Sequence, residues 1–117
     1  MEQFKSRKQP EAKIQKEIVT YFRNKEWFVV RMVGNAFQQG IPDLLATHHK
    51  YGPRFIEVKL PGMKGSHFTA AQLEYFPKFC ANGMGIWIMT AANAEQYRMV
   101  VTEPPNWWQY LSTARKV

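Results

Sequence analysis

The sequence has one cysteine and no long apolar run. Its single cysteine, Cys80, excludes an intrachain disulfide, so packing must hold the fold, as in a reducing compartment. No apolar run approaches the roughly 18 residues that span a bilayer, and no signal-peptide pattern opens the chain. We therefore expect a soluble cytoplasmic protein with no membrane partner.

Acidic residues are also scarce. Nine Asp and Glu stand against sixteen Lys and Arg, which gives a formal net charge of +7. The excess is concentrated at the start, because residues 1–25 hold seven basic and three acidic residues, a balance of +4. Such a balance favours polyanions such as nucleic acids, although many small basic proteins bind no nucleic acid specifically.

The length of 117 residues fits one domain. Residues 1–9 are polar and basic and are expected to form a flexible arm, which leaves residues 10–117 as the domain. A helix is expected from Pro10 to Lys25, with proline in its first turn. Its apolar positions recur at helical spacing: Ile14, Ile18, Tyr21 and Phe22.

Three strands are expected next, because the following segments are rich in β-branched and aromatic residues. They are Trp27–Val33, expected to be buried on both faces, then Asp43–Thr47 and Arg54–Leu60. A loop over Gly34–Gly40 and a turn over His48–Pro53 separate them.

A second helix is expected after these strands. Thr69 opens it, Pro77 should kink or split it, and Asn82-Gly83 ends it.

Two further strands are expected at Gly85–Thr90 and Tyr97–Val101, before Asn106 caps a short helix that runs through Leu111. The order of helices and strands indicates an α/β fold, in which helices flank one mixed sheet.

The residues that indicate chemistry are Asp43, Glu57 and Lys59. Glu57 and Lys59 are two apart on an expected strand, so their side chains leave the same face, and we expect that face to open to a cleft or to solvent. Asp43 begins the adjacent strand, fourteen residues earlier, which is enough for a hairpin that brings both carboxylates to one end of the sheet. Two carboxylates there suit Mg²⁺, which prefers oxygen ligands and keeps several waters. The alternative is a solvated Glu-x-Lys face and a Pro-Asp turn without catalytic role.

Three short motifs carry a family resemblance. Gly40–Leu45 (GIPDLL), Phe55–Lys59 (FIEVK) and Thr69–Gln72 (TAAQ) together resemble the PD-(D/E)XK nucleases, and more narrowly their VRR-NUC branch. The resemblance covers roughly residues 10–90. It implies a restriction-endonuclease-like fold, a requirement for Mg²⁺ or Mn²⁺, and hydrolysis of DNA. Stand-alone members, often encoded by phages and bacteria, are similar to Holliday junction resolvases and act as homodimers.

The resemblance also implies roles for particular residues. Asp43 and Glu57 correspond to the metal-binding acids, with the Val58 backbone carbonyl as a further ligand, and Lys59 corresponds to the catalytic lysine. Gln72 corresponds to a glutamine on the helix after the active strand. Thr69-x-x-Gln72 is equally a capping-box pattern, so the sequence leaves open whether Gln72 serves the site or only caps the helix.

The family carries a further acid on its first helix, and Glu11 and Glu17 compete for that place. Glu11 falls on the apolar stripe of the helix and precedes Gln15 by one turn, as in the family motif, whereas Glu17 falls at the edge of the stripe. Glu11 is therefore the preferred candidate for the catalytic site and for the metal. Its alternative role is a favourable charge near the positive end of the helix.

We expect from these observations a metal-dependent endonuclease that hydrolyses DNA phosphodiester bonds, with branched DNA such as a Holliday junction as its substrate. The alternatives are a DNA-binding module that keeps the fold without catalysis, and an RNA-processing nuclease on the same scaffold. Trp107-Trp108 is expected to lie in a subunit interface.

Overall fold

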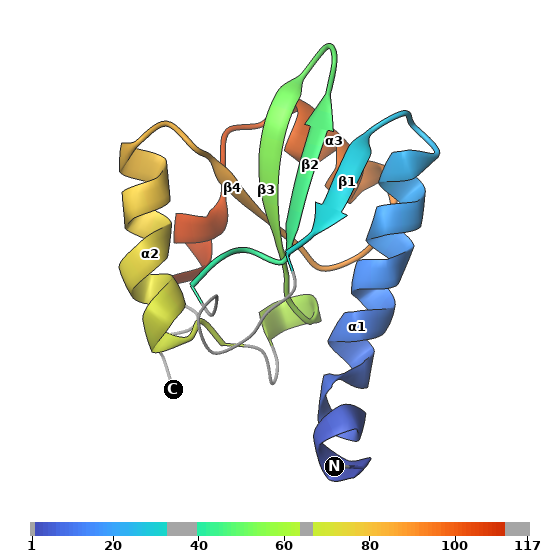
Figure 1. The fold of residues 1–117 in the computed structure, drawn as a ribbon, viewed down its shortest axis with the longest axis vertical. Coiled ribbons are helices and arrows are strands. Elements are labelled where there is room, and N and C mark those ends of the chain that lie inside the picture. The colour runs from blue at the N-terminus through green and yellow to red at the C-terminus, as the bar shows by residue number, and fades with distance from the viewer. Residues whose placement is uncertain (1, 33–39, 64–66, 112–117) are drawn as a thin grey trace.

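A four-stranded sheet forms the centre of the molecule (Figure 1). The computed structural model describes residues 2–32, 40–63 and 67–111. The strands lie in the order β1-β2-β3-β4. Their bounds are Phe28–Arg31 for β1, Leu44–His48 for β2, Gly52–Val58 for β3 and Ile86–Met89 for β4.

The helices are α1 (Glu2–Arg23), α2 (Ala70–Ala81) and α3 (Ala94–Thr102), with short 3-10 helices at Pro61–Met63 and Trp107–Tyr110. No helix of the described ranges is both long and apolar enough to cross a bilayer.

The sheet is mixed, as expected. β1 pairs with β2 and β2 with β3 in antiparallel fashion, whereas β4 lies parallel to β3. A tight turn suffices between β2 and β3, and Gly52 adopts a φ of 80° where that turn enters β3. The parallel pair requires a crossover, and α2 supplies it between β3 and β4.

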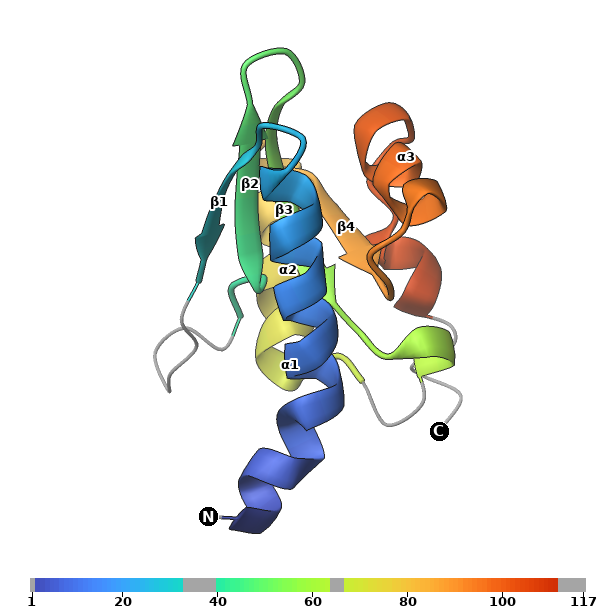
Figure 2. The ribbon, with the colours of Figure 1, turned by 90° about the vertical axis from the view of Figure 1, so that its right-hand side faces the viewer.

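Each face of the sheet has its own core. Side chains alternate along β4, so Trp87 and Met89 pack on one face and Ile86 and Ile88 on the other. α1 and α3 cover the first face, and α2 and the Trp107–Tyr110 helix cover the second (Figures 1 and 2). Strands buried on both sides, such as β4, read as continuous apolar runs.

The first helix is longer than expected. α1 begins at Glu2 rather than at Pro10, so residues 2–9, expected to form an arm, are drawn as helical turns. They extend past the end of the sheet in Figure 1. Glu, Gln, Lys and Arg are good helix formers, and the helix continues through Pro10 although proline removes a hydrogen-bond donor and crowds the preceding turn.

The expected strand at Tyr97–Val101 is wrong, because these residues belong to α3. The Asn93 side chain caps that helix by accepting from the Gln96 backbone N–H at 2.8 Å. Tyr97, Val100 and Val101 then fall on one helical face and pack on the core. The β-branched residues therefore follow the helical spacing and not their strand propensity.

The expectation that the first strand is buried on both faces is also wrong. β1 is an edge strand on which Val29 is buried, whereas Phe28 and Val30 are 68% and 36% exposed. The expected end of this strand at Val33 and most of the loop after it lie outside the described residues.

The ends of the second helix are confirmed. Thr69 is the N-cap of α2, Asn82 is the C-cap, and Gly83 follows with a φ of 91°. Pro77 does not split the helix, which continues through it.

Asn106 precedes the final short helix as expected, but its Oδ1 accepts from the Ile88 backbone N–H at 2.7 Å instead of capping the helix.

Candidate active site

Asp43 and Glu57 lie together at one end of the sheet. The register pairs Leu44 with Ile56, which places Asp43, the residue before β2, opposite Glu57 in β3. The Asp43 backbone N–H donates to Glu57 Oε1 at 3.2 Å, and Asp43 Oδ2 accepts from the Val58 N–H at 2.8 Å. The hairpin therefore brings the two carboxylates together as the spacing predicted.

Lys59 lies on the same side of the chain as Glu57. β3 ends at Val58, but the Lys59 backbone N–H still donates to the Met89 carbonyl at 3.1 Å, which continues the ladder by one bond. The Lys59 Nζ lies 3.4 Å from Glu57 Oε2. Alternation along an extended chain thus gives the acid and the lysine one common face.

Gln72 joins this pair from α2. Its Nε2 donates to Glu57 Oε2 at 2.8 Å, and its Oε1 accepts from Lys59 Nζ at 3.3 Å and from the Thr69 N–H at 3.1 Å. The Thr69 Oγ1 accepts from the Gln72 N–H at 3.1 Å, which completes a capping box. Gln72 therefore caps the helix and also contacts the two candidate site residues, because its amide nitrogen bonds to Glu57 while its amide oxygen accepts from both Lys59 and Thr69.

Two contacts around Lys59 were not expected. The His67 backbone carbonyl accepts from Lys59 Nζ at 2.8 Å, and the Nζ lies 5.0 Å from the centre of the Phe68 ring. A backbone acceptor leaves no trace in the sequence. Phe68, the aromatic residue just before the capping box, was the one sequence feature that could have indicated the second contact, since a buried ammonium is stabilised over an aromatic face.

The site is closed rather than open. Glu57 is 3% exposed and Lys59 is 4% exposed, so the expectation that this face opens to a cleft or solvent is wrong for these two side chains. α2 covers them, and its position is a tertiary property that the period-two pattern of β3 does not encode. Among the described residues, every buried side-chain nitrogen and oxygen has a hydrogen-bond partner.

Burial has a direct electrostatic consequence for Glu57. Desolvation, and then the neighbouring Asp43 carboxylate, raise the pKa of Glu57 from its ordinary 4.5 to about 8, against the opposing effect of Lys59 and Gln72. A carboxyl group in such a place ionises readily only when a further positive charge is present. A cation between Asp43 and Glu57 would supply that charge.

The donor set fits a hard divalent cation. It consists of the carboxylates of Asp43 and Glu57, and a carboxylate oxygen such as Glu57 Oε1 can accept a second partner beside the Asp43 N–H. The N–H and C=O of one extended residue point to the same edge, so the Val58 carbonyl faces the side on which Asp43 lies. Magnesium is bound by one or two protein carboxylates with water completing its shell.

Neither candidate acid of α1 forms a metal-binding cluster with Asp43 and Glu57 in the described part of the chain. Within residues 2–32, 40–63 and 67–111, no three Asp, Glu, His or Cys side chains are grouped so that they could hold a metal ion. Glu11 is half-buried, whereas Glu17 is exposed and lines a surface groove with Lys13 and Lys16. Exposure thus favours Glu11 over Glu17 as the inward acid, but neither joins Asp43 and Glu57 in a group of three.

The tryptophan pair divides between core and surface. Trp107 is 5% exposed and packs against Phe68 and Phe76, whereas Trp108 is 59% exposed. The pair is therefore not a single exposed patch, and the expected interface role applies at most to Trp108.

Comparisons with known proteins bear on the fold. No family model and no curated protein matches the sequence. A solved structure described as a "VRR_NUC domain" superposes with a TM-score of 0.59 at 20% sequence identity, over 78% of this chain and 94% of that one. The chain thus has the fold of that domain, a mixed sheet flanked by helices, in agreement with the resemblance carried by its motifs.

Proposed function

We propose that this chain is a nuclease of the VRR-NUC branch of the PD-(D/E)XK superfamily, which hydrolyses phosphodiester bonds in DNA with the help of a divalent cation. One observation carries the proposal. Asp43, Glu57, Lys59 and Gln72, taken from three separate motifs, are linked by hydrogen bonds at one end of a sheet with the VRR_NUC fold. The chain's net charge of +7 suits a polyanionic substrate.

Asp43 and Glu57 are the proposed ligands of Mg²⁺ or Mn²⁺, together with the Val58 carbonyl. The chemistry supplied by the bound cation is polarisation of a phosphoryl oxygen and a lowered pKa of a coordinated water. Glu11 stays a further candidate, acting through water or after a movement of α1. This assignment accounts for a carboxyl group, Glu57, that is buried beside a lysine and a second carboxyl and whose pKa is raised by that burial.

Lys59 is the proposed catalytic lysine. Its ammonium is directed by the Glu57 carboxylate, the Gln72 amide and the His67 carbonyl, so that its position is fixed before substrate binds. A preorganised cation stabilises the charge that develops on the phosphoryl group as water attacks in line with the leaving oxygen. Gln72 keeps Glu57 and Lys59 in register by bonding to both.

The proposed structure of the DNA substrate and the proposed assembly rest on the resemblance of the motifs to the VRR-NUC branch. We propose branched DNA, such as a Holliday junction, as the target and a homodimer as the active assembly, because two sites at a fixed spacing suit paired cuts. The test is incubation of end-labelled four-way junction, flap, linear duplex and single-stranded DNA, and an RNA strand, with Mg²⁺, Mn²⁺ or EDTA. Cutting of DNA with either cation and not with EDTA supports the proposal.

Other outcomes of the same test support the rival functions. Cutting of the RNA strand alone would indicate an RNA-processing nuclease. Binding of DNA without cutting, by folded protein and with every cation, would indicate a DNA-binding module.

A further inference from the structure

An apolar groove runs along α2 on the sheet face that carries Glu57. Its apolar lining residues are Phe55, Tyr75, Phe79 and Met84. Its volume is about 660 Å³, within the range of small-ligand sites. Tyr75 is 41% exposed, whereas Phe55, Phe68, Phe76 and Trp107 on this face are buried.

The groove begins next to the candidate active site. Phe55 precedes Glu57 by two residues on β3, so both side chains leave the same face about 7 Å apart along the strand. At the near end of the groove, Tyr75 is packed against Gly40, which precedes Asp43 by three residues. From Tyr75 to the C-cap Asn82, seven residues further along the chain, the groove follows α2 over a length of about 10 Å.

The sheet beside the groove is also apolar and uncovered. Val30 pairs with Leu45, and Leu45 pairs with Phe55, so one row of apolar side chains crosses from the edge strand to the groove. Val30 is 36% exposed, and Phe28, on the same face of β1, is 68% exposed. Large apolar side chains left open next to a polar site indicate a ligand with apolar faces.

The charges on the groove rim leave it nearly neutral. Lys78 lies 3.4 Å from Glu74, and both are exposed, so they offset one another. The positive charge that attracts a polyanion comes from the rest of the chain, which carries +7. A basic protein with a neutral aromatic groove beside its site suits a nucleic-acid strand whose bases enter the groove and whose phosphates stay outside.

We propose that this groove binds unpaired nucleobases of the strand that is cut, which makes single-stranded segments beside the scissile bond the preferred substrate. Stacked bases are spaced about 3.4 Å apart, so a length of about 10 Å holds two or three of them. A duplex keeps its bases paired and cannot offer their faces to Tyr75 and Phe79. The assignment of these bases to a cut strand rests on the proposed nuclease function, whereas their binding does not.

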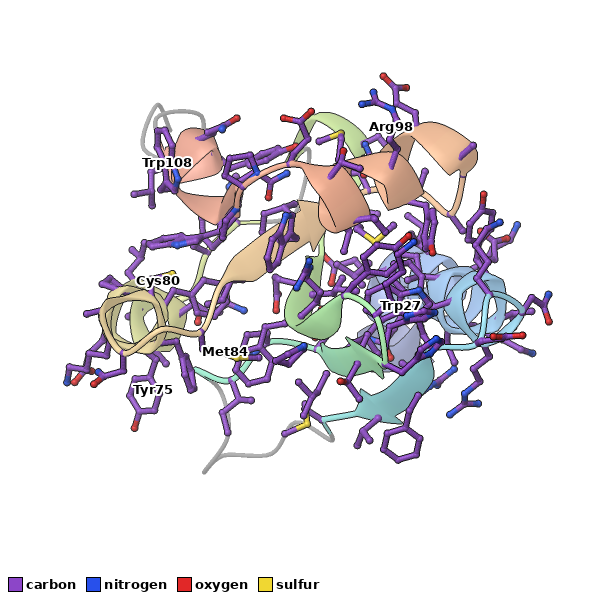
Figure 3. All side chains as sticks on the ribbon, turned by 90° about the horizontal axis from the view of Figure 1, so that it is seen from above. Trp27, Tyr75, Cys80, Met84, Arg98 and Trp108 are labelled. Atoms are coloured by element: carbon purple, nitrogen blue, oxygen red, sulfur yellow. The ribbon has the colours of Figure 1, made fainter. Side chains whose placement is uncertain are left out.

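The test measures the affinity of Tyr75→Phe, Tyr75→Leu and Tyr75→Ala for a labelled DNA single strand and for the matching duplex. Fluorescence anisotropy in EDTA gives both affinities. We expect Tyr75→Phe to bind the single strand like the wild type, and Tyr75→Leu and Tyr75→Ala to bind it about 5- to 100-fold more weakly. Duplex binding should change less than about twofold, because it uses charge rather than stacking. Trp108→Ala is the matched control, since that exposed aromatic lies on the opposite side of α2 (Figure 3).

Three results would overturn the groove assignment. They are single-strand binding by Tyr75→Leu at the wild-type level, equal losses for single strand and duplex, or a wild-type dimer that Tyr75→Leu converts to a monomer in sedimentation velocity. The last result would make the face a contact with a second copy. If Tyr75→Ala fails to fold, the comparison of Leu with Phe decides.

The nuclease proposal fails separately. Single-strand binding that depends on an aromatic residue at position 75, without cleavage in Mg²⁺ or Mn²⁺, supports the groove and contradicts the nuclease. Metal-dependent cleavage, with single-strand binding indifferent to position 75, supports the nuclease and contradicts the groove.

Discussion

Gln72 Nε2 donates to Glu57 Oε2 at 2.8 Å, across fifteen positions of the sequence. The same amide accepts from Lys59 and from the Thr69 N–H through its oxygen. An amide donates only from nitrogen and accepts only at oxygen, so these partners allow one orientation of the Gln72 side chain. A helix cap and a candidate active site therefore depend on one residue.

This sharing predicts that the cap of α2 affects activity beyond its effect on stability. Thr69→Ala removes the Oγ1 that binds the Gln72 N–H, and Asn93→Ala removes the equivalent cap of α3. Each should lower the free energy of unfolding by about 1 kcal/mol in urea titrations. Only Thr69→Ala should lower the cleavage rate, and Thr69→Ser should restore it. Equal activity of the two alanine variants would contradict a positioning role for the cap.

Lys59 should be required for cleavage and not for binding. Lys59→Met keeps most of the side-chain volume and removes the positive charge that lies 3.4 Å from Glu57 Oε2. We expect its single-turnover rate to fall by at least about 100-fold, the effect of losing one preorganised electrostatic group. DNA affinity, measured by anisotropy, should stay within about twofold. Lys50→Met, at an exposed hairpin position, is the control and should retain activity.

The raised pKa of Glu57 predicts how stability depends on pH without metal. Below about pH 4.5 the carboxyl is protonated whether the chain is folded or unfolded, and above about pH 8 it is ionised in both. Between these limits only the unfolded chain releases the proton, so the free energy of unfolding should fall as the pH rises. Urea titrations from pH 5 to 8.5 in EDTA measure this, beside Glu57→Gln. The variant should show a flatter profile, and identical profiles would show that Glu57 does not titrate in this range.

Gly40 should resist substitution because of Tyr75. A Cβ at Gly40 would lie 2.6 Å from Cγ of the Tyr75 ring, much closer than atoms in contact. Gly40→Ala must therefore displace the ring or the loop that leads to Asp43. We expect a loss of about 1–3 kcal/mol in the free energy of unfolding, typical of overpacking, and a lower cleavage rate. Wild-type stability and rate in Gly40→Ala would show that the loop moves without consequence.

The sequence was sufficient to predict that Asp43, Glu57 and Lys59 lie together. Strand alternation placed Glu57 and Lys59 on one face, and the hairpin length brought Asp43 opposite Glu57. These are local rules, and the structure obeys them. The motifs also predicted the fold, which the superposed VRR_NUC domain shares.

The sequence did not predict the features of the fold and of the site that depend on tertiary packing. Burial of Glu57 and Lys59 follows from the position of α2, and the double role of Gln72 follows from the distance between its cap and β3. The strand expected at Tyr97–Val101 gave way to α3 because a helical face fits the core there. Phe28 and Val30 of β1 are exposed because neither packs into the core on its face of the sheet, which residue composition does not reveal.

The central claim is that Asp43 and the buried Glu57 together drive metal-dependent hydrolysis of DNA. The most direct measurement is the initial cleavage rate of end-labelled DNA in Mg²⁺ and in Mn²⁺ for the wild type, Glu57→Gln and Glu103→Gln, an exposed acid far along the chain. The account predicts cleavage by the wild type and Glu103→Gln that EDTA abolishes, and none above background by folded Glu57→Gln. Cleavage by Glu57→Gln at the wild-type rate would contradict it.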